Sequence, residues 1–228
     1  MAAGGAIAST IGRLAPHPRA AYRGAQIGQR RFSSKRHTMT DDFAAARTNM
    51  VDSQVRPQDV TDITIQDAMR TIRREDFVAP AKRALAYADA ELEYAPGRWL
   101  LRPRDVAKLI QALTPRAGEA ALAISAPYAG AVLARMGLDV VSCDAADPIP
   151  ARDGGWQVII CEGAVTKAPQ AWLDAIAPGG RLGVVERDDV LGRAMVYLRA
   201  PAAVGVRPVF DSTPPFLAGF EHKTSFVF

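Results

Sequence analysis

The spacing of hydrophobic residues changes near residue 119 of this chain. Before that point, apolar positions recur every three or four residues, which is the spacing of one face of an α-helix. After it, short continuous apolar runs alternate with helical stretches, as in buried parallel strands. The pattern predicts an N-terminal helical module over residues 39–118 and an α/β core over residues 119–228.

Helices in the first module have recognisable start and stop signals. We expect them over residues 42–55, 61–74 and 103–113. Arg56-Pro57 ends the first helix because the residue before a proline avoids the helical region. Asp62 is placed to begin the second, and Pro103 suits the first turn of the third. The stretch 91–97 shows neither periodicity and is interpreted as a loop.

Four apolar runs in the second part predict the strands of a parallel, doubly wound sheet. They cover residues 120–124, 138–143, 157–161 and 181–186, with helices over 129–136 and 168–177 and further strand-like pieces over 194–199 and 210–228. Pro178-Gly179-Gly180 is expected to form a tight turn. The stretch between Asp144 and Trp156 is too short for the added helix and strand of a full βαβ unit, which takes roughly 30 residues. The sheet should therefore lack one strand.

Composition and charge exclude several classes of protein. Apolar residues make up 49% of the 228 residues and charged residues 23%, as in ordinary soluble domains. No uncharged apolar run reaches the roughly 20 residues of a membrane span. The formal net charge of +4 comes from residues 1–38, the leader, whose charged side chains are all basic. The rest of the chain has no basic excess, which argues against binding to nucleic-acid phosphates.

The leader has two interpretations. It resembles an amphipathic transit peptide, with a processing region at Arg30-Arg31-Phe32-Ser33-Ser34, and would then direct the protein to mitochondria. Alternatively, translation starts at Met39, after which acidic residues appear at once, and the leader is disordered or not translated. We favour the second interpretation and expect a cytoplasmic protein.

The two cysteines do not indicate a metal site. Cys143 and Cys161 fall in predicted strands, without CxxC spacing and without a nearby histidine. We therefore expect buried, reduced thiols.

Candidate chemistry lies where the predicted strands end, because parallel sheets bind ligands beyond the carboxyl ends of their strands. The first strand leads into Ser125–Gly130, the second ends at Asp144 and the third at Glu162. An acid after the second strand can accept both hydroxyl protons of a ribose diol. The first loop has one glycine and contains Pro127, whereas cofactor loops use several glycines for close backbone approach. A simple strand-to-helix turn and a solvated acid remain the alternatives.

Longer motifs give a more specific indication. They are Met50-Val51-Asp52-Ser53-Gln54-Val55-Arg56, Asp67-Ala68-Met69-Arg70, Arg74-Glu75-Asp76-Phe77-Val78-Ala79-Pro80, Leu85-Ala86-Tyr87, the segment Gly97 to Leu113, and Pro178-Gly179-Gly180-Arg181-Leu182. Across roughly residues 43–228, this series resembles the protein-L-isoaspartate O-methyltransferase family. The N-terminal motifs are the specific part, since the Pro-Gly-Gly turn is shared by many methyltransferases that use S-adenosylmethionine.

The resemblance implies a Rossmann-like methyltransferase fold with S-adenosylmethionine as cofactor. It also implies an enzyme that transfers a methyl group to the free carboxylate of L-isoaspartyl residues, a step that begins the repair of damaged proteins. The expected partners are isoaspartyl peptides or proteins, with no role for nucleic acid or membranes. Such chemistry needs mainly orientation, because the sulfonium is already a strong methyl donor and the carboxylate a competent nucleophile.

The resemblance also implies which residues form the site. The residues at cofactor-binding positions are Ser125, Tyr128, Gly130, Asp144 and Glu162. The glycine-rich acidic motif of the family aligns with residues 122–130, where its acid and most of its glycines are missing. Leu101 occupies the family's serine position, so no catalytic residue is assigned. Arg98 and Arg102 are candidates to hold the substrate carboxylate through bidentate hydrogen bonds, or are solvated loop residues.

Two other functions are compatible with parts of the sequence. A degenerate family member would keep the fold and act as a binding or scaffold protein, which the departures at Leu101 and residues 122–130 favour. A dinucleotide-dependent oxidoreductase would use the acid at Asp144, but the chain lacks the G-x-G-x-x-G loop that such enzymes need.

Overall fold

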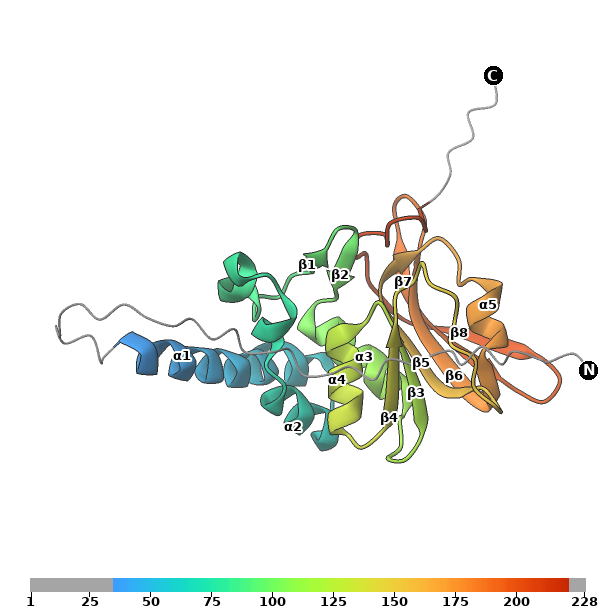
Figure 1. Ribbon diagram of the computed structural model, residues 1–228, viewed down its shortest axis with the longest axis horizontal. Coiled ribbons are helices and arrows are strands. Elements are labelled where there is room, and N and C mark those ends of the chain that lie inside the picture. The colour runs from blue at the N-terminus through green and yellow to red at the C-terminus, as the bar shows by residue number, and fades with distance from the viewer. Residues whose placement is uncertain (1–34, 222–228) are drawn as a thin grey trace, which may run out of the picture.

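The computed structural model describes residues 35–221, which form a six-stranded sheet with helices on both faces (Figure 1). The strand order is β4-β3-β5-β6-β7-β8. The strands are β3 (Ala120–Ile124), β4 (Asp139–Cys143), β5 (Trp156–Val165), β6 (Ile176–Arg187), β7 (Gly192–Arg199) and β8 (Val204–Asp211). The first four strands in this order are parallel, as the sequence predicts, and β7 and β8 are antiparallel.

Helices cover the two faces of the sheet unequally. They are α1 (Lys35–Met50), α2 (Ile63–Thr71), α3 (Pro103–Leu113), α4 (Pro127–Arg135) and α5 (Gln170–Asp174), joined by a π-turn at Val51–Val55 and short 3₁₀ turns at Arg56–Gln58, Arg74–Phe77 and Pro80–Leu85. Helices α3 and α4 lie on the face to which Ala121 and Ala123 point, and α1 and α2 pack beyond them. Leu122 and Ile124 point to the opposite face, where Trp172 of α5 packs.

The N-terminal helices and the sheet share one apolar core. A single cluster of buried side chains runs from Met50 and Val55 through α3 and α4 to Val196 of β7. The helical module is therefore packed into the α/β core, and the domain boundary near residue 119 stays a prediction. The leader interpretations lie outside the described residues, except that α1 already begins at Lys35.

Local signals set several helix ends as expected. Asp62 caps α2, because its Oδ1 accepts hydrogen bonds from the backbone N–H groups of Thr64 (2.8 Å) and Ile65 (3.4 Å). Pro103 occupies the first turn of α3, and Thr114 ends that helix in the left-handed conformation with φ of 44°. These predictions are confirmed.

The prediction of a loop over residues 91–97 is wrong. This stretch forms β1 (Leu92–Ala95), which pairs antiparallel with β2 (Arg98–Leu100). Gly97, with φ of 65°, makes the turn between them possible, and the buried Leu92 lies opposite the buried Leu100. The hairpin stands over the carboxyl ends of β3 and β5, apart from the main sheet (Figure 1).

Two further predictions fail around α5. The expected helix over residues 168–177 shortens to Gln170–Asp174, because Ile176 already pairs with Trp156. The Pro-Gly-Gly stretch is part of β6 and no tight turn. Since the next ladder pair is Val158 with Arg181, residues 177–180 bulge out of the ladder. A Cβ on Gly180 would lie 2.7 Å from the Trp156 carbonyl oxygen, so the bulge requires glycine there.

The last described residues form a strap, residues 215–220, across the end of β5. Ala164 donates its N–H to the Pro215 carbonyl (3.0 Å), and Leu217 donates to the Ala164 carbonyl (2.8 Å). The Leu217 side chain is fully buried against Gly163, and the Phe220 ring packs on Trp172. The strand-like piece expected over residues 210–228 is thus mainly this strap, and residues 222–228 lie outside the described part of the chain.

Between β4 and β5 the described chain contains no strand. As expected from its length, residues 144–155 lead from one strand to the other, and β4 forms the edge of the sheet. None of the helices described, over residues 35–221, is both long and apolar enough to cross a membrane.

Leu217→Ala tests how strongly the strap is held. Removing a fully buried leucine side chain leaves a cavity, so we expect the free energy of unfolding to fall by about 2–5 kcal/mol in urea denaturation. Leu198→Ala, on the exposed face of β7, is the matched control and should change stability by no more than about 0.5 kcal/mol. If Leu217→Ala lowers the free energy of unfolding by as little as Leu198→Ala, burial of the Leu217 side chain in the strap adds little to stability.

Candidate functional site

Two of the expected site residues meet at the carboxyl ends of neighbouring strands. Ile124 pairs with Cys143 in the parallel ladder of β3 and β4, so the residues that follow, Ser125 and Asp144, emerge side by side. Ser125 has a positive φ of 44° and donates its N–H to the Cys143 carbonyl (2.8 Å). Its hydroxyl donates to Oδ2 of Asp144 (3.1 Å).

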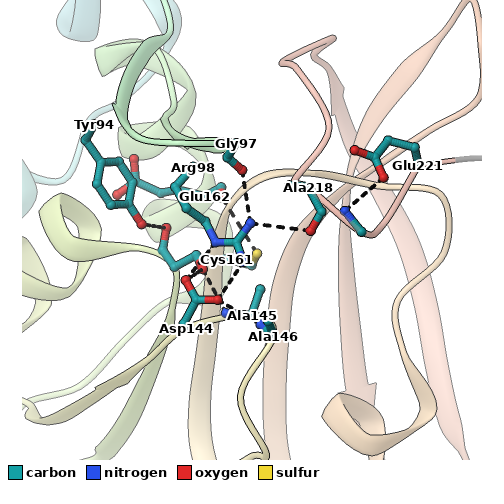
Figure 2. Close-up of polar contacts among 12 residues, drawn as sticks. Tyr94, Gly97, Arg98, Asp144, Ala145, Ala146, Cys161, Glu162, Ala218 and Glu221 are labelled. Atoms are coloured by element: carbon teal, nitrogen blue, oxygen red, sulfur yellow. Dashed lines mark hydrogen bonds and ion pairs between the residues drawn. The ribbon is translucent and has the colours of Figure 1, made fainter.

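The carboxylate of Asp144 is held by an arginine from the β1–β2 hairpin. Arg98 donates from Nε to Oδ2 (2.7 Å) and from Nη2 to Oδ1 (2.6 Å), a bidentate ion pair. Its remaining nitrogen, Nη1, donates to the carbonyls of Gly97 (3.1 Å) and Ala218 (3.4 Å). Figure 2 shows the guanidinium between Asp144 and the strap, with all three nitrogens engaged.

These contacts fix Asp144 as an anion. The bidentate hydrogen bonds from Arg98 hold the pKa of its carboxyl well below the usual range, and the N–H of Ala146 (2.9 Å) and the hydroxyl of Ser125 act in the same direction. Only 11% of the Arg98 side chain is exposed, against 39% for Asp144. In this ion pair the arginine is therefore shielded from solvent, whereas the carboxylate is partly exposed.

Glu162, which was expected to follow the third strand, lies within β5 and is fully buried. Its Oε2 accepts the N–H of Leu101 (2.9 Å), and its Oε1 accepts the N–H of Ala129 in the first turn of α4 (2.8 Å). A carboxylate in this place is favoured by the positive end of the helix dipole. Burial raises its pKa to about 7, while Arg74 and the backbone N–H groups act against that rise.

Leu101 and Tyr128 belong to the core. The Leu101 side chain is fully buried, and its carbonyl accepts a hydrogen bond from Nη2 of the buried Arg74 (2.6 Å). The guanidinium of Arg74 lies 4.6 Å above the ring of Tyr128, which also packs edge-on against Phe77. The structure thus brings Ser125, Asp144 and Arg98 together but places Tyr128 in the core behind them.

The remaining expected residues have other contacts. Gly130 brings α4 close to β3, since a Cβ there would lie 2.9 Å from the Cβ of Ala123. Arg102 forms its own ion pair with Glu91 (2.7 Å) and does not reach Asp144. Neither Arg98 nor Arg102 is a freely solvated loop residue. Among the described residues, no group of three histidine, cysteine or acidic side chains is placed to hold a metal ion.

The sequence interpretation missed two parts of the site. The hydroxyl of Tyr94 donates to the Ser125 carbonyl (3.1 Å), which ties the hairpin to the first strand end. The alternation of Leu92 and Tyr94 on β1 was a signal that could have identified this strand. Ala218 of the strap contributes only a backbone carbonyl, which no sequence pattern reveals.

Comparison with known proteins identifies the family. No protein-family model matches this chain. A protein-L-isoaspartate O-methyltransferase of Methylorubrum populi is 34% identical over 171 residues, covering 63% of this chain and 79% of that protein. This chain belongs to the protein-L-isoaspartate O-methyltransferase family. A second relative, from Methylorubrum extorquens, is 39% identical over 116 residues, and there the chain spans about half of the relative's length (51%).

Solved structures show the same fold. A putative protein-L-isoaspartate O-methyltransferase from Plasmodium falciparum, in complex with S-adenosyl-L-homocysteine, has a TM-score of 0.62. The match covers 75% of this chain and 97% of that one, at 13% identity. The expected Rossmann-like methyltransferase fold is confirmed.

The family's cofactor fits this arrangement only in part. Asp144 follows β4, where a ribose-binding acid belongs, but both of its oxygens are bound by Arg98. The N-terminus of α4 is also in use, since Pro127 has no N–H and Ala129 donates to Glu162. In the structure as described, a nucleoside therefore meets no free acceptor on Asp144, and binding requires Arg98 to move.

Glu162→Gln tests the buried carboxylate. An amide offers only one acceptor oxygen, so Leu101 or Ala129 loses its partner, and we expect unfolding free energy to fall by about 1–3 kcal/mol at pH 5. The folded pKa of about 7 lies above that of an unfolded glutamate, near 4.3. The carboxyl's contribution is thus complete below about pH 4.3 and is lost as the pH rises through about 7.

The difference in stability between wild type and Glu162→Gln should therefore narrow from pH 4.5 to pH 8, followed by urea denaturation at each pH. Glu221→Gln, which changes an exposed carboxylate, is the control and should show no such trend. A difference that stays constant or widens with pH would mean that burial does not raise the pKa of Glu162 in the folded protein.

Proposed function

We propose that this chain carries out the reaction named for its family, the transfer of a methyl group from S-adenosylmethionine to the carboxylate of L-isoaspartyl residues in proteins. Family membership supports the reaction. The single structural observation that carries it is Asp144, which stands at the end of β4 with both oxygens turned to the hairpin. The fold neighbour from Plasmodium falciparum, solved with the demethylated cofactor, supports the choice of cofactor.

The role of the protein in this reaction is to bind and to orient. When bound, the cofactor would supply a sulfonium methyl group that is already electrophilic. Asp144 would accept the two hydroxyls of the ribose, while Ser125 and Ala146 hold its carboxylate in place. Arg98, the first residue of β2, and Arg102, between β2 and α3, would hold the substrate carboxylate.

A second function is favoured by Leu101. Leucine has no hydroxyl to take the place of the family's serine, and the Leu101 side chain is fully buried in the core. A member of this kind would bind isoaspartyl peptides, or another acidic partner, without transferring a methyl group. We also propose that the protein is cytoplasmic.

Radiolabelled methyl transfer to an isoaspartyl peptide separates the two functions. We expect transfer above the no-protein background, and Asp144→Asn should weaken S-adenosylmethionine binding about tenfold or more through the loss of charge-assisted hydrogen bonds. Asp139→Asn, at the exposed opposite end of β4, is the matched control and should leave binding unchanged. Peptide binding without any transfer would favour the binding function.

A further inference from the structure

Arg98 occupies Asp144 in the way that a ribose would. Two hydroxyls of a vicinal diol donate to the two oxygens of one carboxylate, and the Nε–H and Nη2–H groups of Arg98 donate to these same oxygens at 2.7 and 2.6 Å. The guanidinium and the nucleoside therefore compete for a single acceptor. Both cannot be bound to Asp144 in this geometry.

Arg98 has few other partners if a nucleoside binds Asp144 in its place. Apart from Asp144, its partners are two backbone carbonyls, those of Gly97 and Ala218, and only the first of these belongs to its own hairpin. No second carboxylate pairs with Arg98 among the described residues. Once displaced from Asp144, the Arg98 guanidinium would lack a counter-ion. It would then lie near the carboxyl ends of the strands, where we propose that the acidic substrate binds.

We infer that Arg98 exchanges partners: it pairs with Asp144 in the ligand-free chain and with the carboxylate of the isoaspartyl substrate once a nucleoside diol holds Asp144. This inference rests on the proposed function, because it assumes that the nucleoside of the cofactor binds at Asp144. It makes Arg98 both an internal competitor of the cofactor and a substrate ligand that the cofactor releases. Cofactor and substrate then bind cooperatively.

Arg102 does not take part in this exchange of partners. It pairs with Glu91 at 2.7 Å, and its partner is a residue of the N-terminal part that no nucleoside at Asp144 would claim. Its side chain is also more open, with 32% exposed against 11% for Arg98. Arg102→Gln therefore removes an equal charge from the same segment without touching the exchange, and serves as the matched control for Arg98→Gln.

The exchange is tested by calorimetric binding of adenosine, which is an uncharged nucleoside with the required diol, and of an isoaspartyl hexapeptide. Wild type should bind the peptide about fivefold or more tightly when saturated with adenosine, within the usual range of coupling between sites. By linkage, the peptide should tighten adenosine binding by the same factor. The same hexapeptide with a carboxamide in place of the isoaspartyl carboxylate should show no coupling.

The variants give opposite changes in the two affinities. Arg98→Gln frees Asp144, so adenosine should bind more tightly than to wild type by the same factor, about fivefold or more, while peptide affinity in the presence of adenosine falls and the coupling disappears. Asp144→Asn frees Arg98, so the peptide should bind without adenosine as tightly as it binds wild type with it. Arg102→Gln should lower peptide affinity equally with and without adenosine, so its coupling factor should stay at the wild-type value. Circular dichroism and the unfolding midpoint establish that each variant is folded.

Four results would overturn the exchange. Adenosine affinity that is equal in wild type and folded Arg98→Gln would show that the arginine does not compete. Coupling that persists in Arg98→Gln, or that the carboxamide peptide shares, would assign it to another group. If wild type transfers methyl groups in the radiolabel assay but shows no coupling, the exchange alone fails. If neither wild type nor Arg98→Gln binds adenosine and wild type transfers no methyl groups, the exchange and the proposed function fail together.

Discussion

The buried carboxylate of Glu162 connects parts of the chain that are distant in sequence. From within β5 it accepts one backbone N–H from Leu101, in the segment between β2 and α3, and one from Ala129, at the start of α4. Arg74, from the N-terminal module, binds the carbonyl of the same Leu101. A polar group without a partner is costly at this depth, so these contacts oblige the hairpin, the helix and the sheet to adopt one relative arrangement.

The ion pair of Arg98 and Asp144 depends on that arrangement. The hairpin is positioned by the backbone contact of Leu101 and by the hydroxyl of Tyr94, and only then does Arg98 reach the end of β4. The acid at which we propose that the ribose of the cofactor binds thus stands at the end of β4, and the Arg98 side chain of the protein itself is bound to it. Family membership and an occupied acid are compatible, because the first rests on similarity along the chain and the second on one side chain, that of Arg98.

Much of this fold could be read from the sequence, since its core strands are continuous apolar runs and its helices carry local caps. β3 was predicted to the residue, and the cap of α2 at Asp62 was placed correctly. The β1–β2 hairpin escaped because its strands are short and half-buried, and the bulge over residues 177–180 because a Pro-Gly-Gly stretch indicates a turn in isolation. In the site, the position of Asp144 could be predicted. Its pairing with Arg98 could not, because it joins residues 46 positions apart through contacts that have no periodicity.

The position of the strap in the chain affects how the protein is made. A ribosome synthesises every strand of the sheet before it reaches Leu217 and Ala218, so the apolar surface at Gly163 and the open side of Arg98 stay uncovered until the last part of the chain emerges. The strand-end site therefore reaches its final form only after translation has passed the whole sheet. Until then, the nascent chain presents an exposed hydrophobic surface of the kind that chaperones recognise.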